Sequence, residues 1–251
     1  MKVSFFSYKD NQDIITNILK QYPQFKIDNH NFELLIVIGG DGTFISALNK
    51  FKNLNIKILF FNVGKLGFLS KNFLEIDITN ENNFTNYSYL ELMSKNHNFT
   101  AINEILLFAA NNPLHYKINF NRFRFYKFLG SGFFVSTKNG STGLNRSLEG
   151  PILLDDDHFI YNEFLPVKNA QNSYLEDSII LHKDMIINAE WDDTKQENFI
   201  KIDGQIHRIN DNFVTIALVK SKAKIYKLST NDYLKNISSK LLGEYEDETK
   251  I

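Results

Sequence analysis

The chain of 251 residues contains no cysteine. This absence excludes disulfide bonds, thiolate catalysis and any metal site built from cysteine ligands. The formal net charge is only -1, so no global field attracts nucleic acid or an anionic membrane. We find no signal-peptide core and no apolar run long enough to span a bilayer. These absences predict a cytoplasmic protein without nucleic-acid or membrane partners.

Several common kinds of catalytic and metal site are also missing from the sequence. The six histidines are scattered and show no zinc-type spacing. The acidic run at residues 155–158 is typical of a solvated loop, because no spacing of histidines or carboxylates supports a cation site. The Gly-x-Ser-x-Gly turn of serine hydrolases does not occur. The chemistry must therefore come from other groups.

One short stretch, residues 39–43, carries two adjacent glycines, an acid, a third glycine and a threonine. The apolar run at residues 32–38 predicts a buried strand before it, and the apolar spacing over residues 44–51 predicts a helix after it. Glycine lets the backbone approach a ligand closely, and the N–H groups at a helix start favour a phosphate. We therefore predict a phosphate-donor site at Gly39, Gly40 and Thr43.

Asp41 is the unexpected residue in this turn. A carboxylate that faces a phosphate pocket is repelled, unless it holds a metal ion or accepts a proton from an attacking hydroxyl. The alternative is a structural role, in which Asp41 or Thr43 caps the helix. The combination of residues behind a buried strand favours a functional role for Asp41.

The first part of the chain predicts a Rossmann-like parallel α/β domain. Strands are predicted at residues 2–7, 32–38 and 56–61, with helices at residues 14–22 and 44–51. In such sheets the crossovers are right-handed and ligands bind beyond the carboxyl ends of the strands. A second glycine turn follows the third strand at this edge, and it adds Gly64 to the predicted phosphate-donor side.

From about residue 100 the pattern changes to short strands separated by turns, which predicts a mostly antiparallel, β-rich, sandwich-like domain. We expect an N-terminal domain at residues 1–98, a β-rich domain at residues 99–229 and a C-terminal segment at residues 230–251, the last with a helix over residues 232–242. The strands are predicted at residues 105–109, 114–120, 122–128, 133–136, 178–181, 185–189, 199–202, 213–219 and 223–228.

Two polar clusters in this second part have both a structural and a ligand-binding interpretation. Asn103 and Glu104 precede an apolar strand, where they could cap the strand or bind two adjacent ribose hydroxyls. Residues 136–143 are rich in hydroxyl groups and glycine, which is typical of a surface loop or of a second ligand-binding loop that uses Thr142. Asp203 and Gly204 predict a hairpin turn.

Taken in this order, the motifs resemble those of the NAD kinase family. The match covers residues 39–43, 62–69, 103–104, 136–151 and 203–205, and so spans most of the chain. The first motif is shared with lipid kinases and phosphofructokinases, whereas the Asn-Glu pair and the glycine-serine-threonine loop make the resemblance specific. The resemblance implies two domains with a site between them and a C-terminal segment that packs on the first domain. It also implies phosphorylation of the adenosine ribose 2′-hydroxyl of NAD to give NADP.

The resemblance further implies roles for individual residues. Asp41 would be the base on the 2′-hydroxyl, and Gly42 would lie against the nucleotide. The donor would be ATP or polyphosphate, carried with Mg²⁺ or another divalent cation that offsets the repulsion at Asp41. A homodimer or homotetramer is implied, in which a neighbouring subunit completes the pocket. The residues of the NAD pocket would be Asn103, Glu104, Ser131, Asn139, Thr142, Gly143, Leu144, Asn145, Arg146, Ser147 and Asp203.

The chain departs from the family pattern at several positions. Leu144 stands where a tyrosine is usual, Ser131 where an aspartate is frequent, and Asn139 where a serine or threonine is common. Gly143 replaces a frequent alanine. Two alternatives therefore stay open: a lipid or sugar-phosphate kinase that shares only the first glycine turn, and an NAD-binding protein without catalytic activity.

Overall fold

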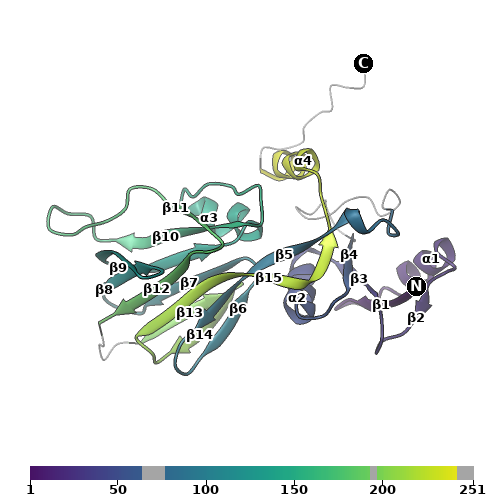
Figure 1. The fold of residues 1–251 in the computed structure, drawn as a ribbon, viewed down its shortest axis with the longest axis horizontal. Coiled ribbons are helices and arrows are strands. Elements are labelled where there is room, and N and C mark those ends of the chain that lie inside the picture. Colours follow the sequence, from purple (N-terminus) through teal and green to yellow (C-terminus); the bar gives the residue numbers. More distant parts are fainter. Residues whose placement is uncertain (64–76, 193–196, 242–251) are drawn as a thin grey trace, which may run out of the picture. The chain divides into compact units, whose positions relative to one another are not determined.

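The computed structural model describes residues 1–63, 77–192 and 197–241 (Figure 1). It divides into two compact units, Met1–Tyr87 with Ser221–Ile251, and Ser88–Lys220. The sequence pattern instead divides the chain after residues 98 and 229. The difference arises because β5 (Phe84–Met93) and β15 (Phe213–Tyr226) each contribute residues to both units. The second glycine turn, with Gly64, lies outside the described residues.

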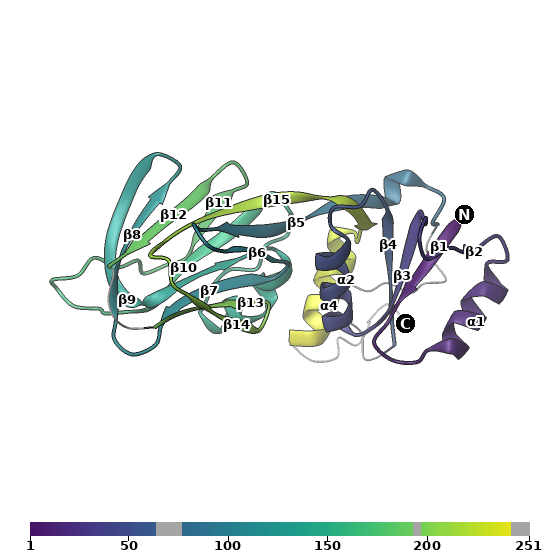
Figure 2. The same cartoon turned by 90° about the horizontal axis from the view of Figure 1, so that it is seen from below.

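The first unit contains a parallel sheet in the order β4–β3–β1–β2, drawn in two views in Figures 1 and 2. The end of β15 adds to it, parallel to β4. The predicted parallel α/β architecture is thus confirmed. The elements of this unit are β1 (Lys2–Phe6), α1 (Gln12–Gln21), β2 (Lys26–Ile27), β3 (Leu34–Gly39), α2 (Asp41–Phe51), β4 (Lys57–Asn62), the 3₁₀ turn η2 (Glu81–Asn83) and α4 (Thr230–Leu241).

Strand β3 is the centre of this sheet, and its first five residues are buried. Such a run of apolar residues is typical of a parallel strand that is covered on both faces. Helix α1 contributes Ile18 to the core that contains β3, and helix α2 packs Phe44 against Phe60 of β4 with ring centroids 4.5 Å apart. Burial of each such side chain stabilises the fold by about 1.5–3 kcal/mol. The glycine turn therefore projects from a rigid base.

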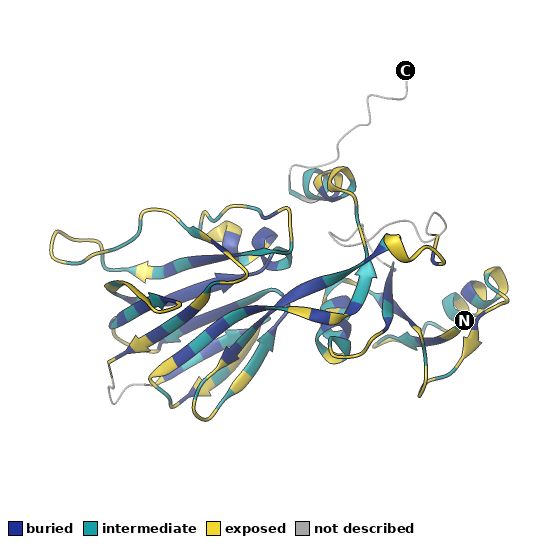
Figure 3. Ribbon diagram, in the orientation of Figure 1, coloured by how far each residue is buried: buried dark blue, intermediate teal, exposed yellow. Residues whose placement is uncertain are grey.

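The second unit is built from antiparallel strands in the order β14–β13–β7–β9–β8–β12–β15, and β10 also pairs with β9 and β11. Figure 3 shows the alternation of buried and exposed positions along these strands. The predicted β-rich architecture is confirmed. The remaining elements are β6 (Asn98–Ala101), β7 (Glu104–Ala109), β8 (Leu114–Phe120), β9 (Phe123–Ser136), η3 (Asn139–Thr142), α3 (Leu144–Ser147), β10 (His158–Pro166), β11 (Ile179–His182), β12 (Ile186–Trp191), β13 (Asn198–Ile202) and β14 (Gln205–Ile209).

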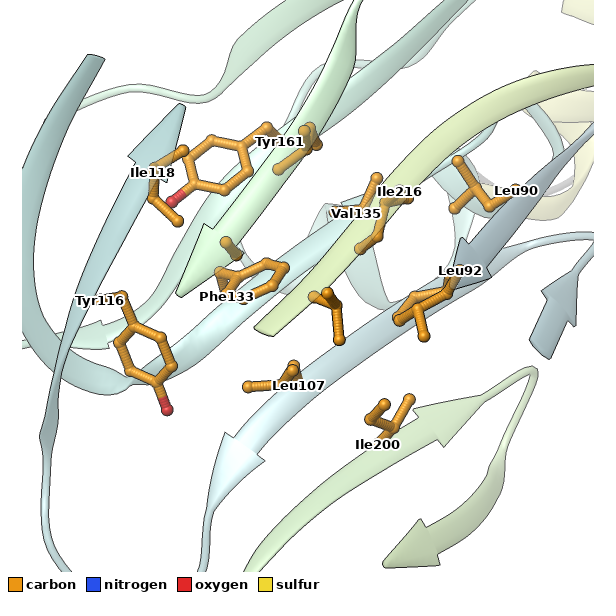
Figure 4. Packing of buried hydrophobic residues seen from close by; sticks show 14 of the residues in the cluster. Leu90, Leu92, Leu107, Tyr116, Ile118, Phe133, Val135, Tyr161, Ile200 and Ile216 are labelled. Carbon is orange, nitrogen blue, oxygen red and sulfur yellow. The ribbon is translucent and has the colours of Figure 1, made fainter. Parts of the chain in front are cut away.

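The core of the second unit brings together side chains from most of these strands (Figure 4). Leu107 of β7, Phe133 of β9 and Tyr161 of β10 all lie in this core, and each is fully buried. Strand β7 is therefore held firmly along its length. Because Glu104 is the first residue of β7, the core fixes the position of a predicted ligand-binding residue.

Several element boundaries differ from the sequence-based prediction. The segments predicted as separate strands at residues 122–128 and 133–136 form the single strand β9, and those at 213–219 and 223–228 form β15. Strands β2, β5, β6, β10 and β14 were not predicted, because polar residues interrupt their apolar pattern. Among the described residues, no helix has the length and apolar character that a membrane crossing requires.

Candidate active site

The glycine turn of the first unit lies between β3 and α2. Helix α2 begins at Asp41, where the backbone N–H groups of Thr43 and Phe44 both donate to the Gly40 carbonyl, at 3.0 and 3.1 Å. The prediction that the helix starts at Phe44 was wrong, because Gly42 and Thr43 already form its first turn. Gly39 is required by close packing, since a Cβ there would lie 2.5 Å from Thr43 Oγ1. Asp41 thus stands at the positive end of the helix dipole.

A pocket of about 260 Å³ opens beside this turn, at the carboxyl ends of β1, β3 and β4. Three residues predicted for the phosphate donor, Gly39, Gly40 and Thr43, line it. Its other wall is the segment Ser7–Asn11, which sequence reasoning missed. The signal was present, because this segment follows β1 and so leaves the sheet at the same edge as the glycine turn. Asp41 and Gly42 are not among the described residues that line the pocket.

The second unit gathers Asn103, Glu104 and Asp203 at one end of β7. Asp203 Oδ1 accepts hydrogen bonds from the backbone N–H groups of Asn103 at 2.8 Å and Glu104 at 3.1 Å, and its Oδ2 accepts one from Ile102 at 2.7 Å. Asp203 lies in the tight hairpin between β13 and β14, with a φ of 45°. The predicted hairpin is confirmed, and its acid fixes the backbone of the Asn-Glu pair.

Two half-buried carboxyl groups therefore lie close together. Burial, and to a smaller extent the nearby Asp203 charge, raise the pKa of Glu104 from 4.5 to about 7, against an opposing effect of Lys201. Burial also raises the pKa of Asp203, but three backbone N–H donors oppose that rise by stabilising its charged form. Glu104 is consequently the group of the pair that takes up a proton near neutral pH.

The loop at residues 136–143 packs directly against the Asn-Glu pair. Thr137 donates its backbone N–H to the Asn103 carbonyl at 2.9 Å and its hydroxyl to the Ile102 carbonyl at 2.7 Å. A Cβ on Gly140 would lie 2.3 Å from the Asn103 carbonyl oxygen, so only glycine fits there. A Cβ on Gly143 would lie 3.9 Å from Glu104 Oε2, which places this exposed glycine beside the acid. The loop and the Asn-Glu pair thus form one cluster.

Within this loop, the predicted pocket residues differ in accessibility. Asn139 begins the 3₁₀ turn that ends at Thr142, and Thr142 is buried. Leu144 is half-buried, whereas Arg146 and Ser147 are exposed on α3. Asn145 is fully buried, and its side-chain N–H₂ group donates to the Ser141 and Pro151 carbonyls at 3.2 and 2.8 Å. The Asn145 side chain therefore stabilises the backbone of the loop and does not reach its surface.

Ser131 is the one predicted pocket residue of this unit that lies apart from the cluster. It belongs to β9, and its carbonyl accepts a hydrogen bond from the Tyr116 hydroxyl at 3.3 Å. Five strand residues at about 3.3 Å each separate it from Ser136 by roughly 17 Å. A single chain therefore does not bring Ser131 to Glu104. Among the described residues, no three histidine, aspartate or glutamate side chains gather in a way that could hold a metal ion.

Comparison with known proteins gives a consistent result for both units. The family model of the ATP-NAD kinase N-terminal domain matches residues 8–82. An NAD kinase from Ureaplasma parvum is 32% identical over 228 residues, which cover 86% of this chain and 84% of that protein. The chain belongs to the NAD kinase family. An NAD kinase from Thermosipho melanesiensis is also 32% identical, over 242 residues covering 90% of this chain and 87% of the relative.

Solved NAD kinase structures share the fold along nearly the whole chain. An NAD kinase from Archaeoglobus fulgidus, crystallised in complex with ATP, has a TM-score of 0.75 at 20% identity and covers 95% of this chain and 99% of its own. Yeast NADH kinase complexed with NADH has a TM-score of 0.72 at 16% identity, covering 98% of this chain and 89% of its own. The two-unit architecture is therefore that of the NAD kinase fold.

Proposed function

We propose that this NAD kinase family member transfers the terminal phosphoryl group of ATP or polyphosphate to the adenosine ribose 2′-hydroxyl of NAD, giving NADP. The observation that carries the proposal is the 32% identity to an NAD kinase over 86% of the chain. The clustering of Asn103, Glu104 and Asp203 with the loop at residues 136–143 supports it independently. A kinase that shared only the glycine turn would have no reason to build this cluster.

Asp41 is the proposed general base. The 2′-oxygen of the ribose attacks the terminal phosphorus, its proton passes to Asp41, and the bond between that phosphorus and the bridging oxygen breaks, so that ADP or a shortened polyphosphate leaves. The hydroxyl has a far higher pKa than a carboxyl group, so proton transfer must accompany bond formation. Catalysis then depends on positioning and on charge neutralisation.

Asn103 and Glu104 are the proposed ribose-binding pair. A charged glutamate can only accept hydrogen bonds, and an asparagine can donate them, so together they suit two adjacent hydroxyl groups. Asn139, Thr142, Gly143, Leu144, Arg146 and Ser147 would line the pocket around them. Asp203 and Asn145 act through the backbone that they hold in place. Gly42, in the first turn of α2, lies against the nucleotide in this proposal.

A divalent cation, most simply Mg²⁺, would enter with the donor. Asp41 is the one carboxylate that we place at the reacting phosphate. A single carboxylate cannot supply all the ligands that Mg²⁺ requires. The donor phosphates would therefore hold most of the cation's coordination sphere. When bound, the cation neutralises negative charge on the phosphates that react.

We further propose that the working enzyme is a homodimer or homotetramer. Ser131 lies about 17 Å along β9 from the cluster that contains Glu104. A neighbouring subunit could bring its own Ser131 to the far end of the dinucleotide. Size-exclusion chromatography with light scattering tests the assembly, and a monomer with full activity would contradict this part of the proposal.

Purified protein incubated with Mg²⁺, NAD and either ATP or polyphosphate tests the function. We expect NADP, detected by chromatography, and loss of the product when EDTA removes the cation. Asp41→Asn should lower the rate by at least about 10²-fold, because general-base catalysis contributes about that much. Asp13→Asn, at an exposed position in the first turn of α1, is the matched control and should keep its activity. Tight NAD binding with no NADP from either donor would instead indicate a non-catalytic NAD-binding protein.

A further inference from the structure

The segment Ser7–Asn11 forms a wall of the pocket beside the glycine turn, although the proposed function assigns it no role. It has a defined shape. Ser7 Oγ accepts hydrogen bonds from the backbone N–H of Lys9 at 3.2 Å and from Asn11 Nδ2 at 2.6 Å, and Asn11 Nδ2 also donates to the Lys9 carbonyl at 3.3 Å. These bonds fold the segment into a turn around Ser7 Oγ, so the position of Lys9 in the wall is fixed by local chemistry.

The same turn is tied to the helix that carries the proposed base. The Tyr8 hydroxyl is hydrogen-bonded to Ser46 Oγ of α2, and the Tyr8 ring packs edge-on against Phe6, with centroids 5.5 Å apart. Helix α2 begins at Asp41. The wall of the pocket is therefore tied to α2 through Tyr8, the residue next to Lys9.

The charge in this pocket is positive. Among the described residues that line it, Lys9 carries the only charged side chain. The nearest acids in sequence do not line the pocket: Asp10 Oδ1 accepts the backbone N–H of Gln12 at 3.2 Å, and Asp41 begins α2. Lys9 is exposed to solvent. The described lining therefore attracts anions, with Lys9 and the Thr43 hydroxyl as side-chain donors.

The size of the pocket restricts the ligand. Sites for drug-sized ligands measure about 300–1,000 Å³, whereas this pocket holds about 260 Å³. It is large enough for a short chain of phosphates and too small to enclose a complete nucleotide triphosphate. Under the proposed function, the part of the donor that fits here is its chain of phosphates, which ATP and polyphosphate share.

We infer that Lys9 is a donor-binding residue, whose ammonium group holds the phosphate chain of the donor against the glycine turn. The inference rests on the proposed function, and it adds a positively charged side chain to the proposed donor site. A lysine acts on phosphate as a mobile point charge, which suits donors with chains of different length. Replacement of Lys9 should accordingly weaken binding of the phosphate donor and leave binding of NAD unchanged.

Steady-state kinetics of Lys9→Ala, Lys9→Arg and the control Lys26→Ala test this role. Lys26 lies in the same unit, on β2, is exposed, and does not line the pocket. We expect Lys9→Ala to raise KM for ATP and for tripolyphosphate about tenfold, the loss of one charge-assisted contact, with KM for NAD within twofold of the unaltered protein (about 0.4 kcal/mol). Lys9→Arg should recover most of the loss. Equal donor KM values for Lys9→Ala and the unaltered protein would overturn the inference, as would a parallel rise in both KM values.

A binding measurement separates this inference from the proposed function. Inorganic tripolyphosphate is titrated calorimetrically into the unaltered protein and into Lys9→Ala, with Mg²⁺ and without NAD. Weaker binding to Lys9→Ala supports the phosphate site even if no NADP is ever formed, in which case only the proposed function fails. Equal binding to both proteins, or no binding to either at millimolar ligand, would refute the role of Lys9 whether or not the protein makes NADP.

Discussion

The Asp203 carboxylate accepts the backbone N–H of Asn103 at 2.8 Å across 100 positions of sequence. It also accepts the N–H groups of Ile102 and Glu104, so one side chain fixes the backbone of the proposed ribose-binding pair. Both oxygens are used in these bonds. Asp203 is therefore a positioning residue, and its effect on NAD must pass through the pair that it holds.

Asp203→Asn should weaken NAD binding. The substituted amide turns one acceptor oxygen into an N–H₂ group that faces a backbone donor, which costs about 1–3 kcal/mol and raises KM for NAD about tenfold or more. Asp211→Asn is the matched control, since Asp211 similarly accepts hydrogen bonds from Ser94 and Asn96, in a loop without predicted ligand contacts. The control should lower thermal stability without changing KM for NAD. Equal KM values for the two variants would contradict the positioning role.

Glu104 should make the stability of the NAD-free protein depend on pH. Its pKa in the folded state is about 7, above its ordinary 4.5, so the folded state binds the proton more tightly. The resulting stabilisation is fully present below pH 4.5 and is lost as pH rises through 7. Urea unfolding at pH 5 and pH 8 measures this effect. Between these two values, the unfolding free energy of Glu104→Gln should gain on the order of 2 kcal/mol relative to the unaltered protein. Parallel pH curves for the two proteins would refute the prediction.

NAD binding should show the opposite dependence on pH. Glu104 accepts ribose hydroxyl bonds best as a carboxylate, so NAD affinity should rise as pH increases through 7. Binding at pH 7 should also release a proton, because the ligand stabilises the charged form. Calorimetry in buffers with different ionisation enthalpies measures this release. Glu104→Gln should bind NAD more weakly, with little change between pH 6 and 8, and an unchanged proton release in this variant would exclude Glu104 as its source.

Gly140→Ala should disrupt the loop at residues 136–143. The new methyl group would lie 2.3 Å from the backbone carbonyl of Asn103, and a backbone atom cannot move aside cheaply. Overpacking of this kind costs about 1–3 kcal/mol. Gly143→Ala is the control for stability, because the nearest atom to its new methyl group would be 3.4 Å away. Thermal denaturation should therefore separate the two variants, and equal losses of melting temperature would contradict the packing argument.

Local patterns in the sequence predicted the parts of the site that are local in space. The strand and helix around Asp41 follow from hydrophobic periodicity, and the hairpin at Asp203 follows from its Asp-Gly pair. What the sequence could not reveal is that the Asp203 carboxylate reaches Asn103. Nothing in an Asp-Gly turn indicates which distant N–H groups its acid will meet, because that depends on the pairing of β13 with β7.

Long strands were predicted in pieces for a related reason. In β9, Gly130 and Gly132 suggested a break, and in β15 the polar residues 220–222 did. The structure keeps both strands continuous because their partners change along their length. Strand β9 pairs with β8 at first and then with β7 and β10, and β15 pairs with β12 before its last residues reach β4. Tertiary pairing thus overrides the local breaks.

The last strand to be synthesised also sets an order for assembly on the ribosome. The first compact unit needs the end of β15 beside β4, and that segment lies after Ser221. The second unit is one continuous stretch, Ser88–Lys220, so all of it can emerge while the opening strands still wait for their final neighbour. A chain released after Lys220 should therefore protect residues 88–220 from proteases better than residues 1–87.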